Sequence, residues 1–198
     1  MIIINNDSQT VIIVIHEIYG INEHMKNICH LLSNKGFDVI CPNLLNKDTS
    51  FDYSHEKAAY LHFMDNIGFK KASDIIKRLL LDMKDKYKKV YLIGFSVGAT
   101  VAWLCSKEES LDGIVGYYGS RIRNYLEIDP HCPTMLVFPQ KERSFHVDEL
   151  ISCFEEKKMV EVHKFNGLHG FSDQYSPNYH VKSAQEAFSK VIEFIKRH

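Results

Sequence analysis

A serine stands between two glycines in the segment Gly94-Phe95-Ser96-Val97-Gly98, directly after the apolar run Lys89–Ile93. The residues that follow, 99–105, have a helical pattern. In a sharp strand-to-helix turn, flanking glycines remove side chains that would clash, and the serine hydroxyl is exposed above the sheet. The adjacent helix N-terminus favours developing negative charge. The pattern predicts a nucleophilic serine. The alternative is a tight turn that needs small residues only for packing.

A nucleophilic serine needs a base, which follows the serine and the acid in the chain order of α/β-hydrolases. His169 lies in a glycine-flanked loop, 166–171, after the predicted strand 159–165. Loops at the carboxyl ends of parallel strands are where such sheets place their sites. His163 lies within that strand, and His180 is expected on the last helix. The sequence favours His169 as the base, against a loop histidine that bonds only its own backbone.

The acid is expected after the predicted strand 133–138. Glu142 is the first carboxylate in the charged loop that follows, whereas Asp148 and Glu149 lie further on in a helical pattern. A carboxylate beside the base orients the imidazole and stabilises its charged form. We expect Glu142 to be this acid. The alternative is a solvated residue of a charged loop.

An oxyanion needs two backbone N–H groups aimed at it. One is expected from Val97, the residue after the nucleophile. The other is expected from the loop His16–Gly20, which follows the apolar run Val11–Ile15.

Short apolar runs alternate with amphipathic helical patterns along the whole chain. Continuously apolar runs are typical of strands buried on both faces of a parallel sheet. The expected strands are 2–4, 11–16, 38–41, 89–93, 112–118, 133–138 and 159–165.

Three helices are well marked. The first begins after the N-cap Asn22 and stops at Gly36, the second covers 69–87, and the last contains Val181 and is preceded by the cap pair Ser176-Pro177. The alternation predicts one α/β domain over residues 1–198. Its sheet is mostly parallel, with about seven strands and helices on both faces.

Two connections stand out from this alternation. The segment Asn5–Gln9 suits an antiparallel hairpin between the first two strands, at the sheet edge. Residues 45–68 are polar and aromatic, with a possible short helix from Ser54, and they are read either as a lid over the site or as an extra surface helix.

Composition bounds the function. The 198 residues carry a net charge of −1 without a block of like charges, which excludes the basic footprint of a nucleic-acid binder. Val11–Ile15 is far too short to span a membrane, and no secretory signal is visible. Five scattered cysteines, each expected to be buried, fit a reducing compartment and give no metal motif. We expect a cytoplasmic protein with a small-molecule substrate, no nucleic-acid or membrane partner, and a monomeric or homodimeric state.

The chain resembles the dienelactone hydrolase family of α/β-hydrolases. The segments VIIVIHEIYGIN at 11–22, VYLIGFSVGA at 90–99, DGIVGYYGSRI at 112–122 and NGLHGF at 166–171 carry the likeness. By resemblance, Ser96 is the nucleophile, His169 is the base, and Glu142 occupies the acid position. The resemblance also assigns the oxyanion hole to the N–H groups of Ile18 and Val97, and it places Glu17 and Tyr19 in the pocket.

The chain also departs from this family. The founding enzymes have cysteine where this chain has Ser96 and aspartate where it has Glu142, and their glutamate at the position of Glu17 interacts with the resting cysteine. They also hold a carboxylate-bearing lactone with arginines, and the residues directly after His169, Gly170–Asp173, include none. The resemblance implies a serine hydrolase that cleaves a small ester or lactone through an acyl-enzyme without a metal or organic cofactor. The alternatives are a non-catalytic binding protein, or an acyltransferase or peptidase on the same scaffold.

Overall fold

The computed structural model describes all residues, 1–198, and centres on one seven-stranded sheet. Its strand order is β1-β3-β2-β4-β5-β6-β7, and every neighbouring pair is parallel except β1 with β3. The seven predicted strands and the mostly parallel sheet are confirmed. The strands are β1 (Ile2–Ile4), β2 (Thr10–Ile15), β3 (Asp38–Cys41), β4 (Lys89–Phe95), β5 (Gly113–Tyr117), β6 (Thr134–Pro139) and β7 (Val160–Phe165).

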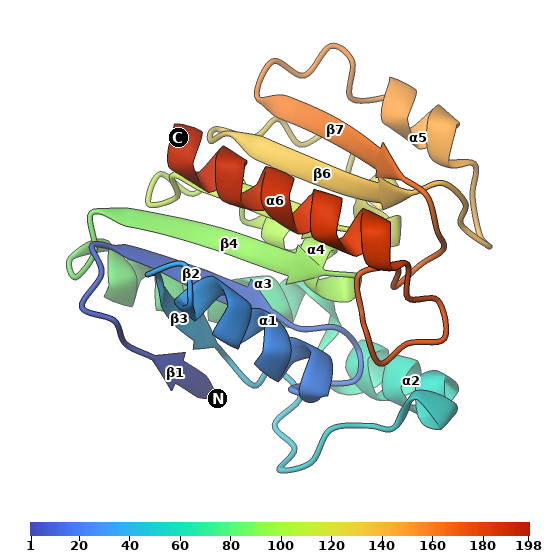
Figure 1. Ribbon diagram of the computed structural model, residues 1–198, viewed down its shortest axis with the longest axis horizontal. Coiled ribbons are helices and arrows are strands. Elements are labelled where there is room, and N and C mark those ends of the chain that lie inside the picture. The colour runs from blue at the N-terminus through green and yellow to red at the C-terminus, as the bar shows by residue number, and fades with distance from the viewer.

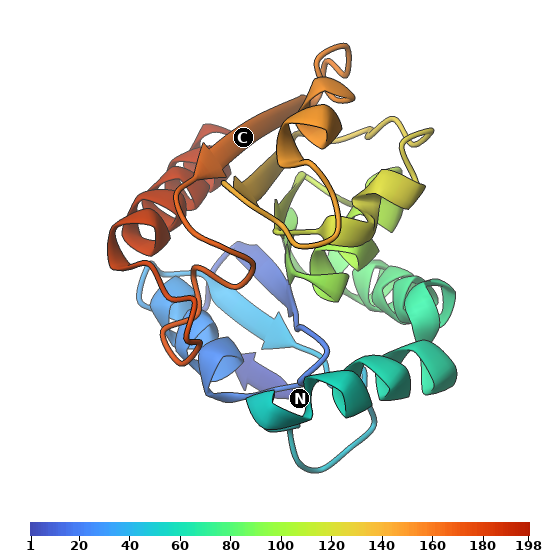
Figure 2. The ribbon, with the colours of Figure 1, turned by 90° about the vertical axis from the view of Figure 1, so that its right-hand side faces the viewer.

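Helices cover both faces of the sheet, as Figures 1 and 2 show. One face is covered by α1 and α6, and the other by α3 and α4, while α2 lies beyond the carboxyl ends of the strands. The helices are α1 (Glu23–Ser33), α2 (Glu56–Asn66), α3 (Gly68–Lys84), α4 (Val97–Leu104), α5 (Val147–Ser152) and α6 (Val181–Arg197), with 3-10 turns η1 (Tyr53–His55) and η2 (Ser120–Asn124).

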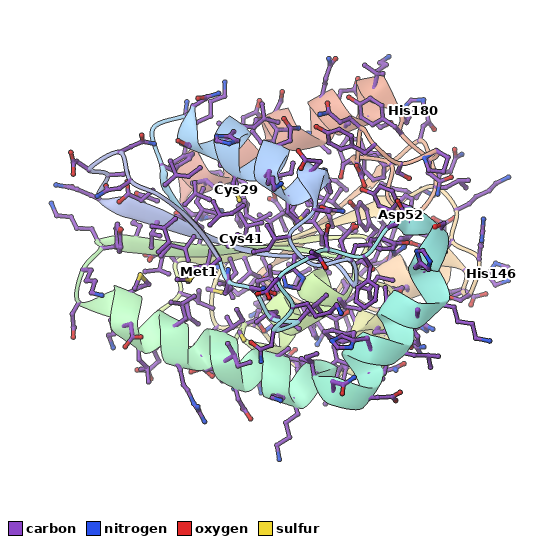
Figure 3. The ribbon with its side chains drawn as sticks, turned by 90° about the horizontal axis from the view of Figure 1, so that it is seen from below. Met1, Cys29, Cys41, Asp52, His146 and His180 are labelled. Atoms are coloured by element: carbon purple, nitrogen blue, oxygen red, sulfur yellow. The ribbon has the colours of Figure 1, made fainter.

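Side chains of the central strand β2 point alternately to the two helical layers. Ile13 and Ile15 pack in the core that includes α3 and α4, whereas Ile12 packs in the core beneath α1 and α6. Cys29 of α1 and Cys41 of β3 lie in this second core (Figure 3). Because both faces of β2 are buried, its sequence is apolar without interruption.

The predicted hairpin at the N-terminus is wrong. Strand β1 pairs antiparallel with β3, with Ile3 opposite Ile40, while β2 lies between β3 and β4. The connection from β1 to β2 bends around the buried carboxylate of Asp38, which accepts hydrogen bonds from the N–H groups of Asn6 (2.8 Å) and Ser8 (3.1 Å). Both edges of β2 are already occupied, so β1 adds to the free edge of β3.

The N-terminal helix end agrees with the sequence at α1 but not at α6, and α1 ends at Ser33 with Asn34 as its C-cap, before the predicted stop at Gly36. The side chain of Asn22 caps α1 by accepting from the Met25 N–H at 3.0 Å, as predicted. By contrast, α6 begins at Val181 and is capped by His180, so Ser176-Pro177 is not its first turn. The cysteine expectation also fails once, because Cys153 is exposed while the other four are buried.

The order in which strands are added to the sheet changes side between β2 and β4, which are themselves parallel. From β2 the chain moves outward to β3 on one side, and from β4 it moves outward to β5 on the other. A crevice at the carboxyl ends of the strands forms at such a point, and ligands bind there in open α/β sheets. No helix of the structure is long and apolar enough to cross a membrane.

Candidate active site

Ser96 stands at this point, between the end of β4 and the start of α4. Its backbone has φ +52° and ψ −112°, a strained conformation for a residue with a side chain. The flanking glycines permit the turn. A Cβ atom at Gly94 would overlap the Gly98 carbonyl oxygen, and one at Gly98 would overlap the carbonyl oxygen of Ile15 at the end of β2. The same contact presses the loop after β2 against the turn.

Three side chains from different strand ends form a hydrogen-bonded chain. His169 Nε2 lies 3.0 Å from Ser96 Oγ, and His169 Nδ1 lies 2.7 Å from Glu142 Oε1. With the proton on Nδ1, the imidazole donates to the carboxylate and leaves Nε2 free to accept the serine proton. The structure thus brings together the predicted nucleophile, base and acid. Asp148 lies apart on α5, exposed and paired with Lys164.

His169 is held by its loop and by one aromatic neighbour. Its carbonyl oxygen accepts from Asn178 Nδ2 at 2.8 Å, and its ring lies 4.9 Å from the ring of buried Tyr118. Burial lowers the pKa of His169, but the hydrogen bond and the negative charge of Glu142 more than offset this and raise the pKa above its ordinary value of 6.5.

The two expected oxyanion donors are both unpaired within the protein. The N–H of Val97 lies in the first turn of α4, where no preceding helical carbonyl exists to accept it. The N–H of Ile18 donates to no backbone or side-chain acceptor. Both residues are buried beside the elbow. Two amides without partners, on buried residues, suit an anion that arrives with the substrate.

His16, which sequence reasoning did not single out, holds the loop of Ile18 in place. Its Nδ1 lies 2.7 Å from the Glu17 carbonyl oxygen, and its Nε2 accepts from the Leu44 N–H at 3.0 Å. The ring is buried, which lowers its pKa to about 4 and keeps it neutral. Its position at the end of an apolar strand was the available signal.

The two predicted pocket residues differ in environment. Glu17 is 5% exposed, and burial raises the pKa of its carboxyl from 4.5 to about 7, although the charge of His169 opposes this. Tyr19 is half-buried, and its ring meets that of Tyr53 edge-on at 4.8 Å.

The segment 45–68, left open by the sequence, lies against the site. The Phe51 N–H donates to the Tyr19 carbonyl oxygen at 2.9 Å, and Arg121 Nη2 donates to the Tyr60 hydroxyl at 2.6 Å. A cavity of about 430 Å³ opens on this segment. Its lining consists of Tyr53, Ser54, Glu56, Lys57 and Tyr60.

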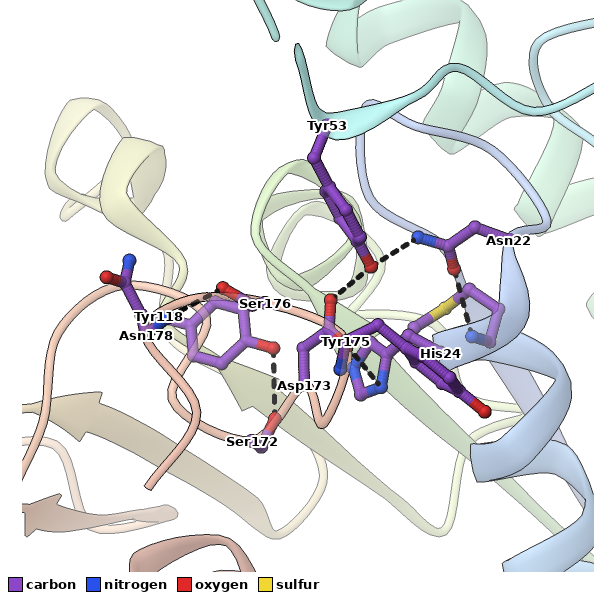
Figure 4. A network of polar contacts seen from close by, with 10 residues as sticks. Asn22, His24, Tyr53, Tyr118, Ser172, Asp173, Tyr175, Ser176 and Asn178 are labelled. Atoms are coloured by element: carbon purple, nitrogen blue, oxygen red, sulfur yellow. Dashed lines mark hydrogen bonds and ion pairs between the residues drawn. The ribbon is translucent and has the colours of Figure 1, made fainter. Parts of the chain in front are cut away.

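Sequence reasoning also missed a buried polar network beside the base. Tyr53 donates its hydroxyl hydrogen to Asp173, and Asn22 Nδ2 donates to the Tyr53 oxygen at 3.1 Å (Figure 4). His24 lies 3.7 Å from Asp173. These residues are scattered through the chain and carry no motif, so no local signal could have grouped them.

The sheet, the strained serine turn and the loops at the carboxyl ends of the strands define a hydrolase of the α/β-hydrolase type. The model of the dienelactone hydrolase family matches residues 2–198. The chain belongs to the dienelactone hydrolase family.

Individual relatives support this assignment. The chain is 40% identical to the uncharacterized protein YczH of Bacillus subtilis (strain 168), over 93% of this chain and 90% of that one. It is 24% identical to a carboxymethylenebutenolidase of Pseudomonas sp. (strain P51), over 94% and 84%. The structure of the Pyrococcus furiosus esterase Pf2001 superposes with a TM-score of 0.71 at 22% identity, covering 98% of this chain and 85% of that one. This last likeness shows the fold.

Proposed function

We propose that the protein is a serine hydrolase that cleaves a small ester or lactone through an acyl-enzyme. The observation that carries the proposal is the continuous chain from Glu142 Oε1 through the His169 ring to Ser96 Oγ, with hydrogen-bond distances of 2.7 and 3.0 Å. Such a chain on a strained turn beside two unpaired amides is the arrangement that acyl transfer requires.

The reaction proceeds in two steps. His169 takes the proton of Ser96 as the oxygen attacks the carbonyl carbon, and Glu142 stabilises the imidazolium that forms. The N–H groups of Ile18 and Val97 hold the oxyanion, and the leaving alcohol takes the proton back from His169. Water, activated by the same histidine, then attacks the acyl-enzyme and releases the acid. The proposal uses no metal and no organic cofactor.

The proposed substrates are small. The segment 45–68, which lies against the site, is largely polar and aromatic and contains no long apolar run that could cover an acyl chain. Acyl chains beyond about eight carbons would leave apolar surface in water, at about 0.8 kcal/mol for each exposed CH₂. The relatives named carboxymethylenebutenolidase favour a lactone among the substrates to test. Five free cysteines support a reducing compartment, and we propose the cytoplasm.

Covalent labelling tests this function directly. A fluorophosphonate probe should label the wild-type protein, and Ser96→Ala should abolish both labelling and turnover of short-chain nitrophenyl esters. Ser96→Cys should keep measurable turnover, because His169 can deprotonate a thiol that also lies at a helix N-terminus. A wild-type protein with neither labelling nor turnover would instead favour a non-catalytic binding protein.

A further inference from the structure

Asp173 is a wholly buried carboxylate in the loop of the base. It lies four residues after His169 and is 1% exposed. Its side chain accepts one hydrogen bond from the Tyr175 N–H at 2.8 Å and one from the Tyr53 hydroxyl. Burial of a carboxylate is costly unless donors satisfy it. Tyr53 is its only side-chain hydrogen-bond donor, because both ring nitrogens of the adjacent His24 are without hydrogen bonds.

Tyr53 is itself fixed from the opposite side. Its oxygen accepts from Asn22, the residue that caps α1, and its ring packs edge-on against Tyr19 in the oxyanion loop. Figure 4 shows the Tyr53 hydroxyl between Asn22 and Asp173. One phenol therefore joins the segment 45–68, the start of α1 and the histidine loop.

The histidine loop has other supports, since Phe171 is buried in the core and the Tyr118 hydroxyl lies 3.0 Å from Ser172 Oγ, but no other hydrogen bond joins it to the segment 45–68. Residues 166–180 contain no helix or strand and run as successive turns. Asp173 is part of two of them, because its N–H donates to the Gly170 carbonyl oxygen and its own carbonyl oxygen accepts from the Ser176 N–H, both at 3.0 Å. The His169 side chain is 38% exposed, and its ring bonds only to Glu142 and Ser96. Its placement therefore depends on the loop.

We infer that Tyr53 and Asp173 form a hydrogen-bonded couple of positioning residues, which keeps the His169 ring aligned with Ser96. The inference rests on the proposed function. The hydrogen bond between the two residues fixes the loop from the segment 45–68, so an intact segment is a condition for an aligned base. The couple acts through hydrogen-bond geometry and not through the charge of Asp173, which makes no contact with the His169 ring.

The first test compares Tyr53→Phe with Tyr175→Phe. The control removes a hydroxyl from the histidine loop, on a residue that is 46% exposed and whose hydroxyl makes no hydrogen bond. We expect Tyr53→Phe to lower kcat about 10-fold with KM changed less than about 2-fold, since small misplacement of a catalytic group is costly. The loss should be equal for esters of different acyl chains. A loss confined to KM, or to bulky esters, would assign Tyr53 to substrate binding and overturn the inference, as would wild-type kcat.

The second test asks whether the two residues act through the one bond between them. The Tyr175 N–H and the Tyr53 hydroxyl donate to different oxygens of Asp173, so Asp173→Asn leaves one acceptor oxygen for two donors and breaks one of these bonds. We expect Asp173→Asn, Tyr53→Phe and the double variant to lose kcat by about the same factor, because residues that act through a shared hydrogen bond are not additive. A double variant whose loss is the product of the two single losses would show that Asp173 acts independently of Tyr53 and would overturn the inference.

A measurement without substrate keeps this inference separable from the proposed function. The Nδ1 proton that His169 shares with Glu142 should give a downfield proton NMR resonance in the wild-type protein. We expect Tyr53→Phe to broaden or shift it and Tyr175→Phe to leave it unchanged. If the protein neither turns over esters nor reacts with the probe, the proposed function fails, but this resonance still reports on positioning. An identical resonance in all three proteins would overturn the couple.

Discussion

The serine turn and the acid loop meet at one histidine but are held in different ways. Ser96 is fixed by backbone packing, because two glycines bring the turn against its own helix and against the end of β2. Glu142 stands in a loop between β6 and α5, and its side chain has one hydrogen-bond partner, His169. The position of the nucleophile is therefore set by backbone packing that the fold requires, whereas the acid lies in a loop whose side-chain contact the fold does not require. Changes at the two glycines of the turn should damage folding, and changes at the acid loop should damage only chemistry.

The largest effect is expected at the turn. In Gly98→Ala the new methyl group would overlap the carbonyl oxygen of Ile15, which is backbone in the central strand and cannot move aside. We expect this variant to lose cooperative unfolding or to fail to accumulate as folded protein, measured by circular dichroism and thermal denaturation.

Gly36→Ala is the matched control for this variant. Its φ is +86°, but a Cβ there meets nothing within 4 Å. It should cost only about 1–2 kcal/mol for the left-handed backbone. Equal stability of the two variants would contradict steric fixing of the turn.

The second effect is expected at the acid. Glu142→Gln keeps the side-chain volume but favours the wrong tautomer of His169, and loss of the acid in a serine triad costs about four orders of magnitude in kcat. The unfolding midpoint should stay close to wild type, because the side chain serves one contact in a loop.

Asp148→Asn is the control for the acid, since Asp148 is exposed and pairs only with Lys164. Near-normal kcat in Glu142→Gln together with collapse in Asp148→Asn would transfer the role to Asp148. Collapse in neither would leave His169 oriented by a group other than these carboxylates.

The same contrast explains what the sequence could predict. The serine turn and the buried strands are encoded locally, by glycine spacing and by continuous apolar runs. Ser96 and the sheet could therefore be predicted from the sequence alone. The partner of β1 was not, because it depends on which sheet edge remains free and on Asp38, far along the chain. The couple of Tyr53 and Asp173 was hidden for the same reason: the two are 120 residues apart and meet only through the fold.

A third effect is expected from Glu17, a buried residue within the oxyanion loop. Its carboxyl pKa is raised from 4.5 to about 7, chiefly by burial, so the folded protein keeps a proton that the unfolded chain releases between these values. Stability therefore falls as pH rises through this window, by up to about 3 kcal/mol at about 1.4 kcal/mol per pH unit.

Glu17→Gln should remove this dependence. Denaturant unfolding at pH 5 and pH 8 should show the variant gaining stability relative to wild type at the higher pH. Glu109→Gln, at an exposed position, should show no such gain. If the free energy of unfolding changed by the same amount between pH 5 and pH 8 in the wild type and in both variants, a buried, protonated Glu17 would be contradicted.

The smallest effect concerns the pKa of His169 and separates the two regions most sharply. Burial lowers this pKa, and the hydrogen bond and charge of Glu142 raise it, with the net direction upward from 6.5. The base must be neutral to accept the serine proton, so the acidic limb of the kcat/KM profile should have its midpoint above 6.5, with activity lost as pH falls. The sign for stability is opposite, because a raised histidine pKa stabilises the folded state at low pH and this contribution disappears as pH rises through the folded-state value.

Titration of the His169 ring by NMR can then compare the variants without turnover. Glu142→Gln removes the raising effects of the acid and leaves burial in place, so the pKa should fall below the wild-type value. Ser96→Ala removes a neutral hydroxyl from Nε2, carries no charge away, and should move the pKa far less. Such a difference would mean that the acid loop sets the protonation of the base while the turn sets only the position of the nucleophile. Equal shifts in the two variants would show instead that the turn and the acid loop control the histidine together, and the division between them would not hold.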